Sequence, residues 1–238
     1  MTNRRATAKL AALLCLGLPA VAAPAAAQDG RAGEATGGAE ATVDRPGLVI
    51  RPAALLNRTL AIRGRTAAGD AGRAVSIELQ LLDGTWRPIA LATVGDDGAF
   101  ATAWKTDVAG PLTLRAVVDR PADNASGASE PLVAQTKIFR PAVASWYGPG
   151  FFGRRTACGT RLTRRTLGVA HKTLPCGTNV DLYYAGRTIS VPVIDRGPFV
   201  DGRDWDLTQA TAQALGVRAT VRIGALAPEP TTFKRRRG

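Results

Sequence analysis

The sequence predicts a mostly β protein of two domains, an antiparallel sandwich followed by a small closed barrel with one short helix. Short runs of residues that suit β-strands, some with apolar side chains at every second position, fill most of residues 46–226. Gly, Pro, Asp and Asn separate these runs and predict turns. Only one segment combines the apolar spacing of a helix with signals for both of its ends.

The beginning of the chain carries the features of an exported protein. The chain has 238 residues and a formal net charge of +12, and its length is sufficient for two small domains. Residues 1–27 are expected to be a signal peptide, because Arg4 and Arg5 precede an apolar run too short to span a bilayer, and three alanines before Gln28 offer a cleavage site. Residues 28–45 contain almost no large apolar side chain, which predicts a flexible linker. We expect a protein secreted to the periplasm or cell-wall space, without a stable membrane anchor.

Residues 46–140 are predicted to form the sandwich. In the run at 75–81 apolar and polar side chains alternate, so one face of that strand is apolar. Asp83-Gly84 and Asp97-Gly98 lie between such runs, which predicts a hairpin at each. About seven strands of this kind favour an immunoglobulin-like architecture. The expected strands lie at 60–62, 75–81, 86–94, 99–104, 112–118 and 133–139.

Residues 141–226 are predicted to form the barrel, with its main strands at 143–148, 179–184, 188–195 and 219–223. The helix is expected to follow Asp206, which would cap it together with Gln209, and to end at Gly216. Residues 227–238 end in consecutive basic side chains, and we expect a disordered tail.

Cys158 and Cys176 are the two cysteines that remain once the signal peptide is removed. An even pair in an oxidising compartment predicts a disulfide bond. Two cysteines and the single histidine of the chain make a poor zinc-binding set. Neither a metal nor another cofactor is therefore expected.

Asp195 is the leading candidate for chemistry. A β-branched run brings it to the end of a strand, and Gly197-Pro198 forces a turn directly after it. Apolar neighbours disfavour its ionised form while Arg196 favours it, so this carboxyl could act as a general acid and base. The same side chain could instead cap the turn that follows.

Several motifs in series resemble the rare lipoprotein A family. They are ASWYG at 144–148, TACG at 156–159, AHKTLPCGT at 170–178, VIDRGPF at 193–199, GR at 202–203 and DLT at 206–208. The resemblance covers about residues 143–223 and implies a six-stranded double-psi β-barrel, which expansins, barwin-like proteins and membrane-bound lytic transglycosylase A share in outline. Family members studied as enzymes are lytic transglycosylases that cleave peptidoglycan glycan strands and prefer strands without stem peptides.

The resemblance also assigns roles by position. Asp195 matches the catalytic acid/base, and His171 matches a histidine that would bind the sugar or orient Asp195. Thr160 stands where many members carry glutamate or glutamine, and no glutamate occurs between residues 141 and 223. One carboxyl can serve a lytic transglycosylase, because the muramic acid 6-hydroxyl attacks its own anomeric carbon. Hydrolysis normally needs two carboxyl groups.

The expected substrate-binding residues surround Asp195. Trp146 and Tyr147 offer flat faces that suit pyranose rings, or they pack in the core. Thr160 and Arg196 complete this set.

The expected partners are peptidoglycan glycan strands and, for a cluster of basic side chains, anionic wall polymers; a merely solvated basic face is the alternative. The cluster consists of Arg154, Arg155, Arg161, Arg164 and Arg165. No nucleic-acid-binding motif occurs, and no such partner is expected. The expected activity is that of a lytic transglycosylase, and the alternative is a non-catalytic, expansin-like module that binds wall polysaccharide.

Overall fold

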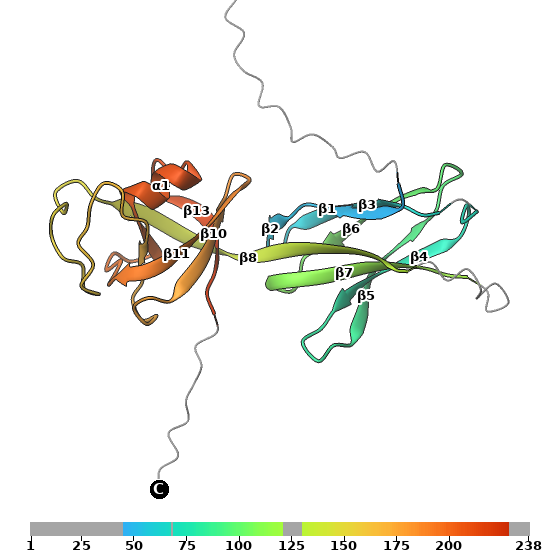
Figure 1. The fold of residues 1–238 in the computed structure, drawn as a ribbon, viewed down its shortest axis with the longest axis horizontal. Coiled ribbons are helices and arrows are strands. Elements are labelled where there is room, and N and C mark those ends of the chain that lie inside the picture. The colour runs from blue at the N-terminus through green and yellow to red at the C-terminus, as the bar shows by residue number, and fades with distance from the viewer. Residues whose placement is uncertain (1–44, 68, 121–129, 229–238) are drawn as a thin grey trace, which may run out of the picture. The chain divides into compact units, whose positions relative to one another are not determined.

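The computed structural model describes residues 45–67, 69–120 and 130–228. The expected signal peptide, the expected linker up to residue 44 and the expected tail from residue 229 lie outside the described residues. The described part of the chain is mostly β, with thirteen strands and one short helix (Figure 1). None of its helices is long and apolar enough to cross a membrane.

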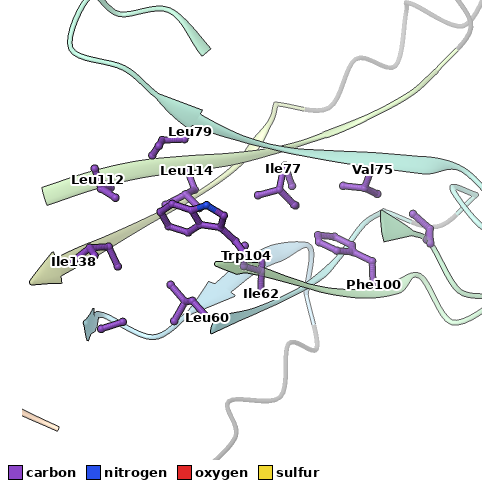
Figure 2. Close-up of a cluster of buried hydrophobic side chains, with 13 residues drawn as sticks. Leu60, Ile62, Val75, Ile77, Leu79, Phe100, Trp104, Leu112, Leu114 and Ile138 are labelled. Carbon is purple, nitrogen blue, oxygen red and sulfur yellow. The ribbon is translucent and has the colours of Figure 1, made fainter. Parts of the chain in front are cut away.

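The N-terminal strands form two sheets around one apolar core. One sheet has the order β1-β3-β6, and the other contains β8-β7-β4-β5. Side chains from both sheets, including Ile62, Ile77 and Trp104, meet between them (Figure 2). The strands are β1 (Gly47–Ile50), β2 (Ala53–Leu55), β3 (Thr59–Arg65), β4 (Ala74–Gln80), β5 (Trp86–Thr93), β6 (Ala99–Lys105), β7 (Gly110–Val118) and β8 (Leu132–Tyr147). An immunoglobulin-like topology stays a prediction.

The two Asp-Gly turns behave differently. Asp83-Gly84 connects β4 to β5, which pair antiparallel, so the predicted hairpin is confirmed. The hairpin predicted at Asp97-Gly98 is wrong, because β5 pairs with β4 whereas β6 pairs with β3 in the other sheet. The turn itself is tight, since Asp97 Oδ1 accepts a hydrogen bond of 3.0 Å from the Ala99 N–H. An Asp-Gly pair reverses the chain but does not choose the strand partner.

The C-terminal strands close into a ring. Pairing runs from β8 to β12, β9, β11, β10 and β13, and β13 pairs with β8 again. The strands that join β8 are β9 (Val169–Ala170), β10 (Asn179–Tyr184), β11 (Arg187–Asp195), β12 (Trp205–Thr208) and β13 (Val221–Leu226). Val180, Leu182 and Val191 form a second apolar core inside this ring, together with side chains of helix α1 (Gln209–Leu215).

Strand β8 belongs to both sets of strands. The sequence predicts two strands here, at 133–139 and 143–148, but residues Leu132–Tyr147 form one. Pro141 lies inside it, at the expected boundary between the domains. At Pro141 the described pairing of β8 is to β13 alone, opposite Gly224, because pairing with β7 ends at Ile138. A proline without an N–H is tolerated where one side of a strand needs no ladder partner.

Helix α1 begins later than the sequence predicts. Thr208 is its N-cap and accepts a hydrogen bond of 3.3 Å from the Thr211 N–H, so the predicted cap by Asp206 is wrong. Pairing of β12 with β8 and β9 holds Asp206 in extended conformation, and this tertiary constraint overrides the local capping signal. The predicted end is confirmed, because Gly216 adopts φ 80° and closes the helix.

Candidate active site

Asp195 ends β11 beside the short strand β9, where it is the partner of Ala170. Its Oδ1 atom accepts one hydrogen bond of 2.8 Å from the Ala157 N–H and another of 2.8 Å from the Arg196 N–H. Asp195 itself is half-buried. The two donors fix the orientation of the carboxyl group, and the donor from Ala157 belongs to the long loop between β8 and β9.

Asp206 carries a second carboxyl group near Asp195, because both residues lie opposite the same residue of β9. Ala170 is the partner of Asp195 on one side and of Asp206 on the other. Asp206 Oδ1 accepts a hydrogen bond of 3.0 Å from Ser145 Oγ, and Arg203 donates to the same Oγ over 3.2 Å. Burial raises the pKa of Asp206, and the charge of Asp195 adds to that rise, while Ser145 and Arg203 oppose it.

Tyr147 brings its hydroxyl group near both carboxyl groups. Burial raises the pKa of Tyr147, and the negative charges of Asp195 and Asp206 raise it further, so the phenol stays protonated. The hydroxyl is buried, and among the described residues no partner satisfies hydrogen-bond geometry with it. It lies close enough to Asp195 to respond to that charge.

His171 follows β9 directly, and its ring packs against Trp205 with 4.5 Å between centroids. Its Nδ1 atom accepts hydrogen bonds from the N–H groups of Leu174 (2.9 Å) and Thr173 (3.2 Å). The proton of the neutral ring is therefore on Nε2. Burial lowers the pKa of His171, and the charge of Arg196 lowers it further, so the neutral form dominates.

His171 and Arg196 contact the backbone carbonyl oxygen of Asp195 rather than its carboxyl group. The His171 N–H donates to the Asp195 carbonyl oxygen over 3.2 Å. The Arg196 guanidinium contacts the carbonyl oxygens of His171 and Asp195 and the Cys176 sulfur. Its ion pair with the Asp195 carboxylate, considered from the sequence, is absent among the described interactions.

The two residues of the expected sugar platform differ in exposure, because Trp146 is 37% exposed and Tyr147 is half-buried, and their role in binding stays a prediction. Trp146 Nε1 donates to the Arg218 carbonyl oxygen over 3.2 Å, and the Tyr147 hydroxyl is buried. Phe151 meets the Tyr147 ring edge-to-face and is 51% exposed, and Phe199, which follows the DRGP motif, is 83% exposed. The sequence analysis did not select them, although the position of Phe199 directly after the DRGP motif was a usable signal.

The predicted disulfide between Cys158 and Cys176 is present, with 5.7 Å between Cα atoms. On either side of it, Cys158 N–H donates to the Ile194 carbonyl over 3.3 Å and Gly177 N–H donates to the Val193 carbonyl over 2.8 Å. The disulfide thus fastens the loop that supplies the Ala157 donor to β11. Within the described residues no group of three His, Cys, Asp or Glu side chains could hold a metal ion.

Thr160 lies in the same loop, where its carbonyl oxygen accepts a 2.8 Å hydrogen bond from the Thr156 N–H. Its side chain is a hydroxyl and cannot supply the carboxyl that a glutamate would bring. Asp206 is the carboxyl that the fold does bring to Asp195. Sequence reasoning assigned Asp206 to a helix cap and did not place it near Asp195.

Comparison with known proteins gives a consistent result for residues 141–226. Residues 141–226 match the family model described as lytic transglycolase. A probable endolytic peptidoglycan transglycosylase RlpA of Synechocystis is 45% identical over 89 residues, which cover 37% of this chain and 28% of that protein. The probable RlpA of Aquifex aeolicus is 46% identical over 31% of this chain and 34% of its own length. RlpA of Campylobacter jejuni is 37% identical over 40% and 38%. The chain therefore spans about a third of the length of these relatives.

Proposed function

We propose that the protein is an exported lytic transglycosylase of peptidoglycan, because residues 141–226 match a lytic transglycosylase family model and resemble RlpA relatives. The observation that carries the proposal is the arrangement of two aspartates, Asp195 and Asp206, around one residue of β9, with Tyr147 near both. Two carboxyl groups in different environments can divide the transfer of protons to and from a glycosidic bond, and the match to the lytic transglycosylase model favours attack by the 6-hydroxyl over hydrolysis.

The two carboxyl groups divide the proton transfers. Asp206, whose pKa is raised, donates a proton to the glycosidic oxygen as the bond from the muramic acid C1 to that oxygen breaks. Asp195, held by two backbone N–H groups, accepts the proton of the 6-hydroxyl as the bond from O6 to C1 forms. The products are a 1,6-anhydromuramyl end and a new free 4-hydroxyl.

His171 binds rather than transfers a proton in this scheme. Its Nδ1 atom is engaged by two backbone donors, so the Nε2–H faces other partners as a neutral donor. A neutral imidazole does not oppose protonation of Asp206 by charge. We assign its Nε2–H to a sugar hydroxyl or acetamido oxygen.

The test is incubation of the exported chain with purified glycan strands, followed by mass spectrometry of the soluble products. Wild-type protein should release 1,6-anhydromuramyl fragments. Asp195→Asn should lower the rate by about 100-fold or more, the usual contribution of a positioned acid or base. Asp201→Asn is the control, because Asp201 is exposed, and it should retain the wild-type rate. Full activity of Asp195→Asn would contradict the assignment.

One observation favours a second candidate, a non-catalytic wall-binding module that acts as expansins do. Thr160 supplies a hydroxyl where the family resemblance leads us to expect glutamate or glutamine, so this position brings no acid to the site. This candidate predicts that the protein sediments with insoluble glycan and creates no new reducing or anhydro ends. Asp195→Asn would then leave binding unchanged.

A further inference from the structure

Ser145 and Asp206 form a hydrogen-bonded pair that is shielded from water. The two residues lie opposite each other in the parallel strands β8 and β12, and Ser145 Oγ lies 3.0 Å from Asp206 Oδ1. Ser145 is 4% exposed, so its hydroxyl group must find its hydrogen-bond partners within the protein. Those partners therefore decide how Asp206, the proposed proton donor, holds its proton.

Arg203 is the second partner of Ser145, and the backbone next to it is fixed to β8. The Asp204 N–H donates to the Val143 carbonyl oxygen over 2.9 Å, and the Val143 N–H donates to Asp204 Oδ2 over 2.7 Å. These two bonds hold Arg203 beside Ser145, where its Nη1 atom lies 3.2 Å from Ser145 Oγ. A guanidinium carried by a fixed backbone segment can orient the Ser145 hydroxyl.

The chemistry of these groups sets the direction of both hydrogen bonds. A guanidinium has donors and no acceptor, so Ser145 Oγ accepts from Arg203. The single hydroxyl proton of Ser145 is then directed to Asp206 Oδ1. An acidic proton on Oδ1 would compete with the Ser145 proton for the space between Oγ and Oδ1. The acidic proton is therefore favoured on Oδ2, to which no described residue donates a hydrogen bond.

We propose that Arg203 is a positioning residue, which holds the Ser145 hydroxyl as a donor to Asp206 Oδ1 and thereby places the acidic proton of Asp206 on Oδ2. This inference rests on the proposed function, in which Asp206 protonates the glycosidic oxygen. The Oδ2–H bond breaks as the proton bonds to that oxygen, and its electron pair stays on the carboxylate. Ser145 donates to Oδ1 before and after the transfer, so this hydrogen bond does not reorganise during the reaction.

The groups that face Asp206 have effects of opposite sign on its proton. Burial raises the pKa of Asp206, Ser145 and Arg203 lower it, and the charge of Asp195 on β11 raises it. The Tyr147 phenol on β8 stays neutral, because burial and the two carboxylate charges raise its pKa. A hydrogen-bond donor to Asp206 favours the carboxylate, whereas an acceptor favours the carboxylic acid. Removal of the Ser145 hydroxyl therefore shows whether Ser145 donates to Oδ1 or accepts from it.

The experiment is a carbon NMR titration of the Asp206 carboxyl group in the wild type, Ser145→Ala, Arg203→Met and the double variant, each checked for folding by circular dichroism. The midpoint should rise in Ser145→Ala and in Arg203→Met, because each variant loses a group that favours the carboxylate. The rise caused by Arg203→Met should be smaller when Ser145 is already alanine. Arg187→Met is the matched control and should leave the midpoint in place, because Arg187 is exposed at the opposite end of β11 from Asp195.

A lower midpoint in Ser145→Ala would mean that Ser145 accepts the acidic proton from Oδ1, and this result, like an unchanged midpoint, would overturn the proposal. Additive rises in the double variant would show that Arg203 acts by its charge alone, and would overturn its positioning role. Ser145→Ala removes a single hydroxyl group, so it tests the direction of the hydrogen bond even if Arg203→Met fails to fold.

The cleavage assay separates this proposal from the proposed function. Ser145→Ala should move the loss of activity at high pH to a higher pH, because Asp206 must be protonated to act as the acid. A raised NMR midpoint with an unmoved pH profile would overturn the assignment of Asp206 as the acid while leaving the orientation of its proton in place. Absence of anhydromuramyl products from the wild type at every pH would overturn the proposed function itself.

Discussion

Asp206 shows how burial sets the protonation of one side chain and, through it, the pH dependence of folding. Its folded-state pKa is raised by burial, so the folded state binds a proton more tightly than the unfolded state. The contribution of this proton is complete below the unfolded pKa of about 3.9 and is lost as pH rises through the folded pKa. Removing the charge should therefore benefit the folded protein most at neutral pH.

Asp206→Asn tests this sign. The difference in melting temperature between the variant and the wild type should be more positive at pH 7 than at pH 3, because the wild type gains its buried charge as pH rises through the raised pKa of Asp206. Thermal melts followed by circular dichroism measure it. Asp201→Asn, at an exposed position, should show no such trend, and an Asp206→Asn difference independent of pH would show that Asp206 has an ordinary pKa.

The pKa and tautomer of His171 can be measured without overlap from other histidines, because the chain has a single histidine. Burial and the charge of Arg196 lower the pKa of His171. An NMR titration of the labelled ring should give a midpoint below the ordinary value of about 6.5. Nitrogen shifts at neutral pH should identify the Nε2–H tautomer, since Nδ1 accepts two backbone hydrogen bonds. A midpoint above that value, or a proton on Nδ1, would contradict the donor role of His171.

The sequence alone identifies some residues of the candidate site but not others. Asp195 is prominent because a β-branched run and a Gly-Pro turn enclose it locally, and the disulfide follows from counting cysteines. Asp206 and Tyr147 become site residues only through the closure of the barrel. The Ser145 and Asp206 side chains bond across 61 positions of sequence, and no local pattern reports that pairing.

Among the elements, the loop between β8 and β9, residues 148–168, is held by a disulfide bond at Cys158. The disulfide closes a segment with a sequence separation of 18 residues, beside the hydrogen bond from Ala157 to Asp195. Replacing both Cys158 and Cys176 by serine should lower the free energy of unfolding of the barrel by about 2–4 kcal/mol, in line with the loss of a disulfide that closes a loop of this size. Release of the loop should also lower the cleavage rate, because Asp195 loses a fixed donor.

Chemical denaturation and product release measure the two effects of this variant. Dithiothreitol provides the matched comparison: it should reproduce both losses in the wild type and have no effect on the double serine variant. Unchanged activity together with reduced stability would show that the Ala157 donor is held without the disulfide.

For the strands, the sequence predicts where each one lies in the chain better than which other strand it pairs with. The alternation in β4 and the Ala185-Gly186 turn between β10 and β11 are local features, and both are found. Pro141 marks a break in the sequence but lies inside β8, since the strand there needs a partner on one side only. Asp97-Gly98 marks a turn, but the competition among strands for partners decides which sheet β6 enters.

For the whole molecule, the described residues bury two apolar cores that share no member. Leu79 belongs to the core of the N-terminal strands, and Leu182 belongs to the core of the barrel. Strand β8 links them covalently, and Phe139 on β8 stacks on Tyr183 with 5.3 Å between ring centroids. Burial of apolar surface dominates stability, so each core should set the melting of its own strands.

Calorimetry of the chain should therefore show two transitions rather than one. Leu79→Ala and Leu182→Ala are matched probes, because both leucine side chains are 0% exposed. Each substitution should cost about 2–5 kcal/mol and lower one transition while leaving the other in place. The transition moved by Leu182→Ala should also be the one that the double serine variant lowers. A single transition shifted equally by both substitutions would mean that β8 transmits the loss of either core to the other.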